Sequence, residues 1–119
     1  MKFDLEDRLV EFSAMIIDTV EILPNSRAGN YIANQMIRCG LSPALNYGEA
    51  QSAESRNDFI HKMKIALKEL RETMMCLKII RRKTLISNPV LIESVIKETN
   101  ELTVIFVKSI STARANNQK

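Results

Sequence analysis

Apolar residues recur every three or four positions through four long stretches of this sequence, and polar breaks separate the stretches. This period places the apolar side chains of a stretch on one face of an α-helix. The first, third and fourth stretches each have a single apolar stripe. The second stretch, 29–50, is apolar on most of its perimeter. The three stripes are Leu5, Leu9, Phe12, Ile16, Val20 and Leu23; Phe59, Met63, Leu67, Leu70, Met74 and Leu77; and Ile92, Val95, Ile96, Thr99, Leu102, Phe106 and Ile110.

Residues typical of helix ends lie between these stretches. Pro24 ends the first helix, since proline cannot continue it, and the second helix begins near Gly29. Ser55 is the expected N-cap of the third helix. Asn88 is the expected N-cap of the fourth, with Pro89 at its first position. Short polar loops therefore connect four helices.

Four amphipathic helices joined by short loops predict an all-α fold, an antiparallel up-down-up-down four-helix bundle. This is the simplest arrangement that buries every stripe. The bundle is expected over residues 1–113. Residues 114–119 have nothing to bury and are expected to form a disordered C-terminal tail.

The second helix has a narrow polar stripe on an otherwise apolar or small surface. Its members are Gln35, Arg38, Ser42, Asn46 and Glu49. At about 100° per residue they fall within an arc of roughly 80°. An ordinary surface helix shows the opposite balance, with a broad polar face. Something besides the other three helices must therefore cover this helix, and a second copy of the chain is the expected partner.

Two interpretations of the polar stripe are open. It is either a satisfied seam that fixes packing and register, which we favour, or a recognition surface for a partner. Arg38 and Glu49 are about 16 Å apart along the helix, so each needs a partner elsewhere. These partners should lie on the third helix, where Glu69 and Arg71 are the candidates, or on a neighbouring subunit, and we expect a carboxylate to hold Arg38. Asn46 should bind a backbone carbonyl.

The second helix contains a proline and a glycine near this stripe, Pro43 and Gly40. Pro43 removes one backbone hydrogen bond and crowds the carbonyl of Cys39, so a kink or local irregularity is expected. The carbonyl that Pro43 frees is a candidate acceptor for Asn46. Gly40 permits another helix to approach closely.

Composition and charge narrow the function only slightly. The chain has 119 residues, 45% of them hydrophobic, and a net charge of +3, which permits contact with nucleic acid without requiring it. A basic cluster closes the third helix, where cations suit the helix dipole and could also contact phosphate. The candidate nucleic-acid contacts are Arg27, Lys78, Arg81, Arg82 and Lys83.

Residues suited to catalysis are scarce. Cys39 and Cys76 lie in apolar patterns without metal-like spacing, as expected of reduced core residues in a cytoplasmic protein. The single histidine, His61, cannot form a histidine-based metal site, and no glycine-rich phosphate loop is present. We expect no enzyme activity, metal, cofactor, small-molecule substrate or membrane span.

The spaced polar residues of the second helix also have a family likeness. The pattern Gln35-x-x-Arg38-x-x-x-Ser42-x-x-x-Asn46-x-x-Glu49 resembles the signature of bacterial four-helix-bundle proteins first noticed in intervening sequences of 23S ribosomal RNA genes. The likeness spans about residues 5–110 and includes Pro24 and the stretch 59–77. This chain departs from the family pattern at two places. Pro43 directly follows Ser42, whereas many members have a proline two residues after the serine, and Ile65-Ala66 stands where many members have Gly-Ser.

The resemblance implies a ring of identical chains, with five copies the best expectation. It also implies a relation to accessory proteins of diversity-generating retroelements, which look like basic rings that engage a reverse transcriptase and nucleic acid. The function expected on this basis is a non-enzymatic ring that binds RNA or an RNA-associated protein. The alternative is a structural or protein-interaction scaffold without a nucleic-acid role.

Overall fold

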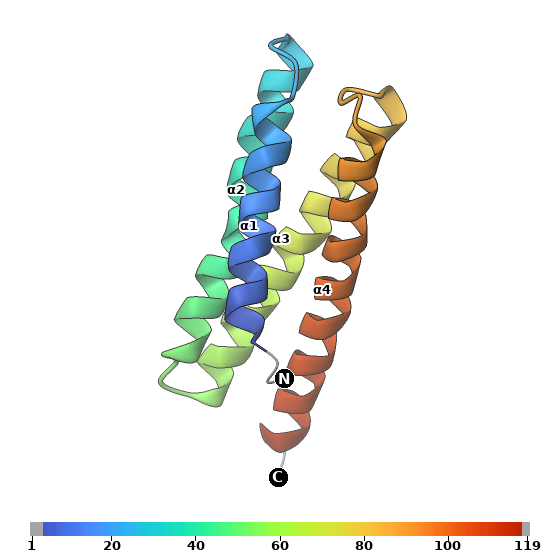
Figure 1. The fold of residues 1–119 in the computed structure, drawn as a ribbon. Coiled ribbons are helices and arrows are strands. Elements are labelled where there is room, and N and C mark those ends of the chain that lie inside the picture. Colours follow the sequence, from blue (N-terminus) through green and yellow to red (C-terminus); the bar gives the residue numbers. More distant parts are fainter. Residues whose placement is uncertain (1–3, 118–119) are drawn as a thin grey trace.

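The computed structural model describes residues 4–117, and these form four α-helices joined by short turns (Figure 1). The predicted all-α four-helix bundle is confirmed. The helices are α1 (Leu5–Glu21), α2 (Arg27–Gln51), α3 (Arg56–Lys83) and α4 (Pro89–Asn117).

Side-chain caps fix where the four helices begin. The Asp4 Oδ1 accepts from the Asp7 amide at 3.1 Å and starts α1. The Ser55 Oγ accepts from the Asp58 amide at 3.0 Å, and the Asn88 Oδ1 accepts from the Leu91 amide at 3.1 Å, so both predicted caps are confirmed. The start predicted for α2 was late. Ser26 accepts from the Gly29 amide at 3.0 Å and therefore starts this helix at Arg27.

Two helix ends also differ from the expected boundaries. α1 ends at Glu21, before the predicted end at Leu23. α4 runs past the boundary expected after Ala113 and ends at Asn117, with Arg114 as a favourable cation in its last turn. The rest of the expected tail, 118–119, lies outside the described residues.

Contacts across the helix pairs establish that α2 and α3 run in opposite directions. Arg38 of α2 pairs with Glu69 of α3, whereas Glu49, later in α2, pairs with Lys62, earlier in α3. The Cα atoms extend over 51 × 31 × 20 Å, so the bundle is long and flat. None of the helices within residues 4–117 is long and apolar enough to cross a membrane.

The core consists mainly of side chains from the predicted apolar stripes, with Met36 of α2 and Ile80 of α3 in addition, whereas Phe59, Leu67 and Met74 of the predicted third stripe are only partly buried. Its largest fully buried side chains are Leu9, Phe12, Ile16, Met36, Met63, Leu70, Leu77, Ile80, Val95, Leu102 and Phe106. The rings of Tyr47 and Phe106 meet edge to face, with centroids 6.3 Å apart. This contact joins α2 to α4 inside the core.

Three threonines are completely buried among these apolar residues: Thr19, Thr73 and Thr99. Each hydroxyl donates to the backbone carbonyl four residues earlier, at 2.7–2.8 Å. A hydroxyl satisfied in this way costs little to bury. Only Thr99 was included in a predicted stripe, because the pattern analysis counted apolar side chains.

Gly40 lets α2 lie close to α1. A Cβ atom at this position would lie 2.6 Å from the Cγ2 of Ile16, which is fully buried. The predicted close approach is therefore confirmed. α2 continues without a break through Pro43, which is buried one turn further along.

The Gly40–Ile16 contact predicts the effect of adding one methyl group. Gly40→Ala should lower the free energy of unfolding by about 1–2 kcal/mol, because the overlap with Ile16 outweighs the better helix propensity of alanine. Gly48→Ala is the matched control, since nothing lies within 4 Å of its Cβ. It should raise stability by about 0.5–1 kcal/mol. Denaturant melts that show equal effects would contradict the close packing.

A second prediction tests the rotation of α3. Leu70 is fully buried, whereas Leu67 is only partly buried and borders a surface groove. Leu70→Ala should cost about 2–5 kcal/mol of unfolding free energy. Leu67→Ala should cost clearly less, because part of the space it leaves opens to water. A larger loss for Leu67, measured at matched protein concentration, would show that α3 is rotated differently.

Candidate functional site

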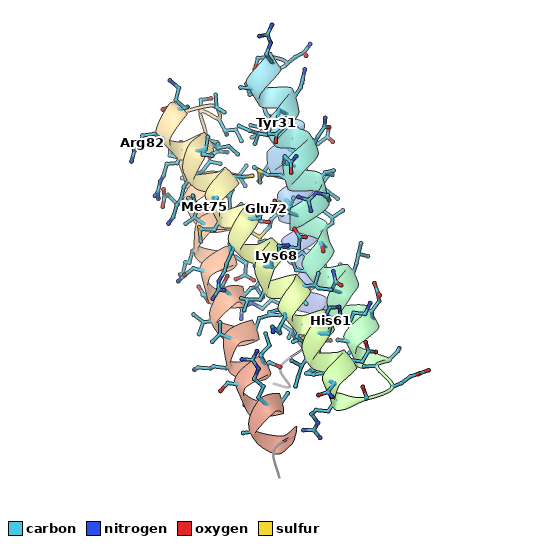
Figure 2. The ribbon with its side chains drawn as sticks, turned by 180° about the vertical axis from the view of Figure 1, so that it is seen from behind. Tyr31, His61, Lys68, Glu72, Met75 and Arg82 are labelled. Carbon is cyan, nitrogen blue, oxygen red and sulfur yellow. The ribbon has the colours of Figure 1, made fainter. Side chains whose placement is uncertain are left out.

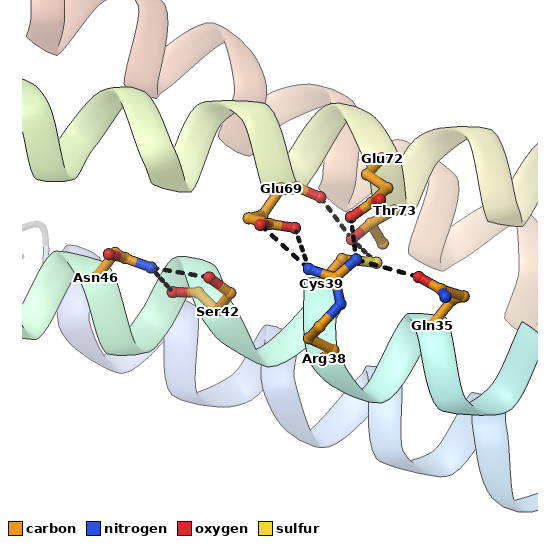
Figure 3. A network of polar contacts seen from close by, with 8 residues as sticks. All are labelled: Gln35, Arg38, Cys39, Ser42, Asn46, Glu69, Glu72 and Thr73. Atoms are coloured by element: carbon orange, nitrogen blue, oxygen red, sulfur yellow. Dashed lines mark hydrogen bonds and ion pairs between the residues drawn. The ribbon is translucent and has the colours of Figure 1, made fainter.

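The polar stripe of α2 lies against α3, and Arg38 is at the centre of its contacts (Figure 3). The guanidinium binds Glu69 at 3.1 Å and Glu72 at 2.7 Å. It also donates to the Gln35 amide oxygen at 3.1 Å. The prediction that a carboxylate holds Arg38, with Glu69 as a candidate, is confirmed. Glu72 is a second partner that the sequence analysis did not foresee.

Helical spacing explains why two carboxylates reach one guanidinium. Glu69 and Glu72 are three residues apart, so both side chains lie on the edge of α3 that faces α2. The fork of Arg38 presents several N–H donors in one plane and can therefore bind both acids together. One arginine thus links two consecutive turns of α3 to α2.

The two carboxyl groups titrate differently because their surroundings differ. Burial raises the pKa of Glu69, and a hydrogen bond with Glu72 raises it further. The pKa of Glu72 is lowered, first by the hydrogen bond with Glu69 and then by the hydrogen bond with Arg38. Lys68 also lowers the pKa of Glu72 through Coulombic attraction. Glu72 is therefore the carboxylate that keeps its charge as the pH falls.

The rest of the stripe has partners in the same chain. The Asn46 side-chain amide donates to the Ser42 backbone carbonyl at 3.0 Å and to the Ser42 Oγ at 2.8 Å. The expected backbone bond is thus confirmed, although the acceptor is not the carbonyl that Pro43 frees. Glu49 pairs with Lys62 at 2.8 Å. Arg71 was the wrong candidate, because it borders the groove between α3 and α4.

The exposure of these side chains decides how the stripe can act. The side chain of Arg38 is 52% exposed, whereas that of Glu69 is only 14% exposed. Water reaches the arginine, so this is neither a dry buried ion pair nor a set of free side chains. Each of the five stripe residues has a partner within the chain. The arrangement is what the seam interpretation expects.

Cys39, the residue after Arg38, contacts Thr73 of α3. Cys39 is fully buried, and the Thr73 Oγ1 approaches its Sγ at 3.2 Å. Hydrogen bonding with Cys76 and burial together raise the pKa of Cys39. The same hydrogen bond lowers the pKa of Cys76. Both thiols are free, and Cys39 serves as a core residue, as predicted.

The candidate nucleic-acid residues lie at one end of the bundle. Arg81 pairs with Glu93 at 3.1 Å, so this cation is already engaged. The other three form the basic cluster of α3, defined as Lys78, Arg82 and Lys83. These residues line a shallow depression of about 250 Å³ together with Met75 and Ile79. Figure 2 shows Met75 and Arg82 on the side of α3 that faces away from α2.

Arg27, the fifth candidate, is exposed at the start of α2. That start lies at the same end of the molecule as the end of α3 (Figure 1). Arg27 belongs to the α1–α2 pair and the basic cluster to the α3–α4 pair. The two pairs separate toward this end of the molecule (Figure 1). A polyanion that follows this end of the bundle could contact both.

The sequence analysis missed a longer basic surface on α3. Lys64, Lys68 and Arg71 are exposed on the part of the helix that faces away from α2. Their spacing of four and three was visible in the sequence, but only the terminal cluster was singled out. His61, also on α3, is exposed as expected. Within residues 4–117, no group of three or more His, Cys, Asp or Glu is placed to hold a metal ion.

Comparison with known proteins agrees with the fold. The profile of the family described as 23S rRNA-intervening sequence protein matches residues 2–108. The chain belongs to this family. A search of curated proteins found no match.

A solved relative extends this assignment to three dimensions. It is a protein of unknown function from the S23 ribosomal protein family of Bacteroides thetaiotaomicron, with 32% sequence identity to this chain. The likeness covers 90% of this chain and 98% of the relative, with a TM-score of 0.83. The intervening-sequence fold therefore accounts for nearly the whole chain.

Arg38→Ala tests whether the stripe is a seam. The change should lower the melting temperature, because the largely covered Glu69 then faces Glu72 without a shared cation. Arg38→Lys is the control, and it should have a smaller effect because a lysine keeps the charge without the planar fork. The difference in melting temperature between Arg38→Ala and wild type should narrow at about 1 M salt, because the Debye length there is about 3 Å and the ion pairs are screened. Unchanged melting with intact assembly would instead favour a recognition surface.

Proposed function

We propose that this intervening-sequence protein is a non-enzymatic binding protein that assembles as a ring of identical chains and binds RNA. The observation that supports RNA binding is the basic cluster of α3. Lys78, Arg82 and Lys83 have no carboxylate partner within the described residues, whereas Arg8, Arg38, Lys62 and Arg81 each have one. Unpaired cations at one end of a helix bundle are suited to phosphate groups.

Assembly as a ring is supported by apolar side chains that the monomer leaves uncovered. Tyr31, Ile37 and Leu45 of α2 are exposed, and Leu45 is 66% exposed. The sequence analysis expected α2 to be covered by another copy, and these residues are the uncovered part of its perimeter. Five copies are proposed on the basis of the family resemblance.

The mode of RNA binding follows from the residue types. The cluster consists of long flexible cations and contains no aromatic side chain, so it can neutralise phosphates but has no platform for stacking bases. Binding should therefore depend strongly on salt and weakly on sequence. The expected partner is therefore RNA of varied sequence, either structured or single-stranded.

The second candidate is a protein-interaction scaffold without a nucleic-acid role. The exposed apolar residues of α2 favour it, since they suit a protein partner as well as another copy. Salt dependence separates the two functions. A scaffold should retain RNA weakly and without a steep salt slope.

The test of RNA binding compares two charge reversals of equal size. Arg82→Glu with Lys83→Glu should weaken RNA binding by about tenfold or more for all sequences, because phosphate contacts are lost. The slope of log affinity against log salt should fall by about 0.7–0.9 for each contact removed. The matched control is Lys97→Glu with Lys108→Glu on α4, both exposed, which should change binding much less. Fluorescence anisotropy over a salt series measures both quantities.

Equal losses in the two variants would mean that only overall charge matters and would remove the cluster as the site. No measurable binding by the wild-type protein at low salt would favour the scaffold.

A further inference from the structure

Charge is distributed unevenly among the helices, although the whole chain has a net charge of only +3. α1 contains five acidic residues and one basic residue. α3 contains nine basic residues and three acidic residues. The other two helices are nearly balanced. The mild net charge therefore conceals one acidic helix and one basic helix.

The exposed surface of α1 is acidic throughout. We call it the acidic face, and its charged members are Asp7, Glu11, Asp18 and Glu21, all exposed. The one cation of this helix, Arg8, points instead toward α4, where it binds Glu98 at 2.8 Å. Two exposed apolar side chains lie among the acids: Val10 is 58% exposed and Ile17 is 40% exposed.

The exposed surface of α3 away from α2 is basic throughout. We call it the basic face, and its charged members are Lys64, Lys68, Arg71, Lys78 and Arg82, all exposed. Figure 2 shows this side of α3, with Met75 and Arg82 projecting away from α2. Two of the acids of α3, Glu69 and Glu72, point instead toward α2, where Arg38 holds them.

Exposed apolar side chains also interrupt the basic face. Met75 and Ile79 of α3 are about half exposed. Val107 of α4 is exposed and shares a groove with Lys64 and Arg71. An apolar centre with a charged margin is the usual composition of a protein interface.

The two faces point in opposite directions. The backbones of α1 and α3 each approach those of α2 and α4 but do not approach each other, so the two helices occupy opposite corners of the bundle. Along the helix axis, the acidic face from Asp7 to Glu21 covers about 21 Å, and the basic face from Lys64 to Arg82 about 27 Å. The faces are therefore similar in length, opposite in charge and both partly apolar.

We propose that the acidic face of one chain meets the part of the basic face formed by Lys64, Lys68 and Arg71 in the next chain, which leaves Lys78 and Arg82 free for RNA. The assignment rests on the proposed ring, and it places the contact on α1 and α3 and not on the exposed apolar residues of α2. Because each chain uses two different surfaces, the contact is heterologous, and repetition of a heterologous contact closes a ring when the rotation permits. Charge complementarity sets the direction in which the copies follow each other.

A pair of charge-reversed variants tests this contact. The first is Glu11→Lys with Asp18→Lys, and the second is Lys68→Glu with Arg71→Glu. The first variant takes the charge of the acidic face from −4 to 0, and the second takes the summed charge of Lys64, Lys68 and Arg71 from +3 to −1. Each variant therefore loses the charge complementarity and should dissociate at a protein concentration about tenfold or more above the wild-type value. Circular dichroism and thermal melting check that both remain folded, since none of the four residues is buried.

Mixing the two variants in equal amounts should give a dimer of one copy of each, because the unchanged acidic face of the second variant fits the unchanged basic face of the first. The two altered faces do not complement each other, so no mixed ring should close. Light scattering coupled to size exclusion measures these masses.

Several results would overturn the assignment, and they are distinguishable. A wild-type monomer at micromolar concentration refutes the ring itself. If the wild type forms a ring, and both variants still form it or the mixed variants form no dimer, the ring stands but this interface is refuted. If Lys68→Glu with Arg71→Glu assembles normally but loses RNA affinity tenfold, the basic face binds phosphate and not another copy.

Discussion

The packing of α2 against α3 is the contact on which the rest of this bundle depends. The backbone of α1 does not approach that of α3, and the packing of α1 against α4 is the least extensive of the helix pairs. Loss of the α2–α3 contact would therefore leave two helix hairpins, neither with a complete core. The buried residues of both helices supply most of its stabilisation, and the Arg38 seam at its edge fixes how the helices are aligned.

The seam also illustrates how a polar group can set register without contributing much energy. Arg38 is half exposed, so its ion pairs are partly screened by water. A shift of α3 by one turn would nevertheless separate Arg38 from one of its two carboxylates and Glu49 from Lys62. Several half-exposed contacts that fail together therefore discriminate one alignment from its neighbours.

The sequence predicted the fold because each level of pattern agreed with the others. Four apolar stripes, the caps at Ser55 and Asn88, and the break at Pro24 all indicate the same four helices. Ser26 was overlooked as a cap, so the start of α2 was placed late. Boundaries depend on single side-chain hydrogen bonds, which a period of apolar residues does not encode.

The candidate site was only partly predictable, and the reason is geometric. Arg38 needed an acid on α3, and the sequence offered Glu69. The participation of Glu72 depends on the rotation of α3, and the pairing of Glu49 with Lys62 depends on its axial position. Neither the rotation nor the axial position of α3 can be predicted from the residue pattern of one helix alone. The same rotation turned Arg71 away from α2 and toward α4.

The segregation of charge between α1 and α3 makes the molecule an electric dipole, which its net charge does not reveal. The shortest dimension of the bundle is 20 Å, whereas the Debye length at physiological ionic strength is about 8 Å. A molecule approaching α1 therefore experiences an acidic protein, and one approaching α3 experiences a basic protein. Such a field turns approaching molecules before they touch, and its influence on encounter rates fades as salt is added.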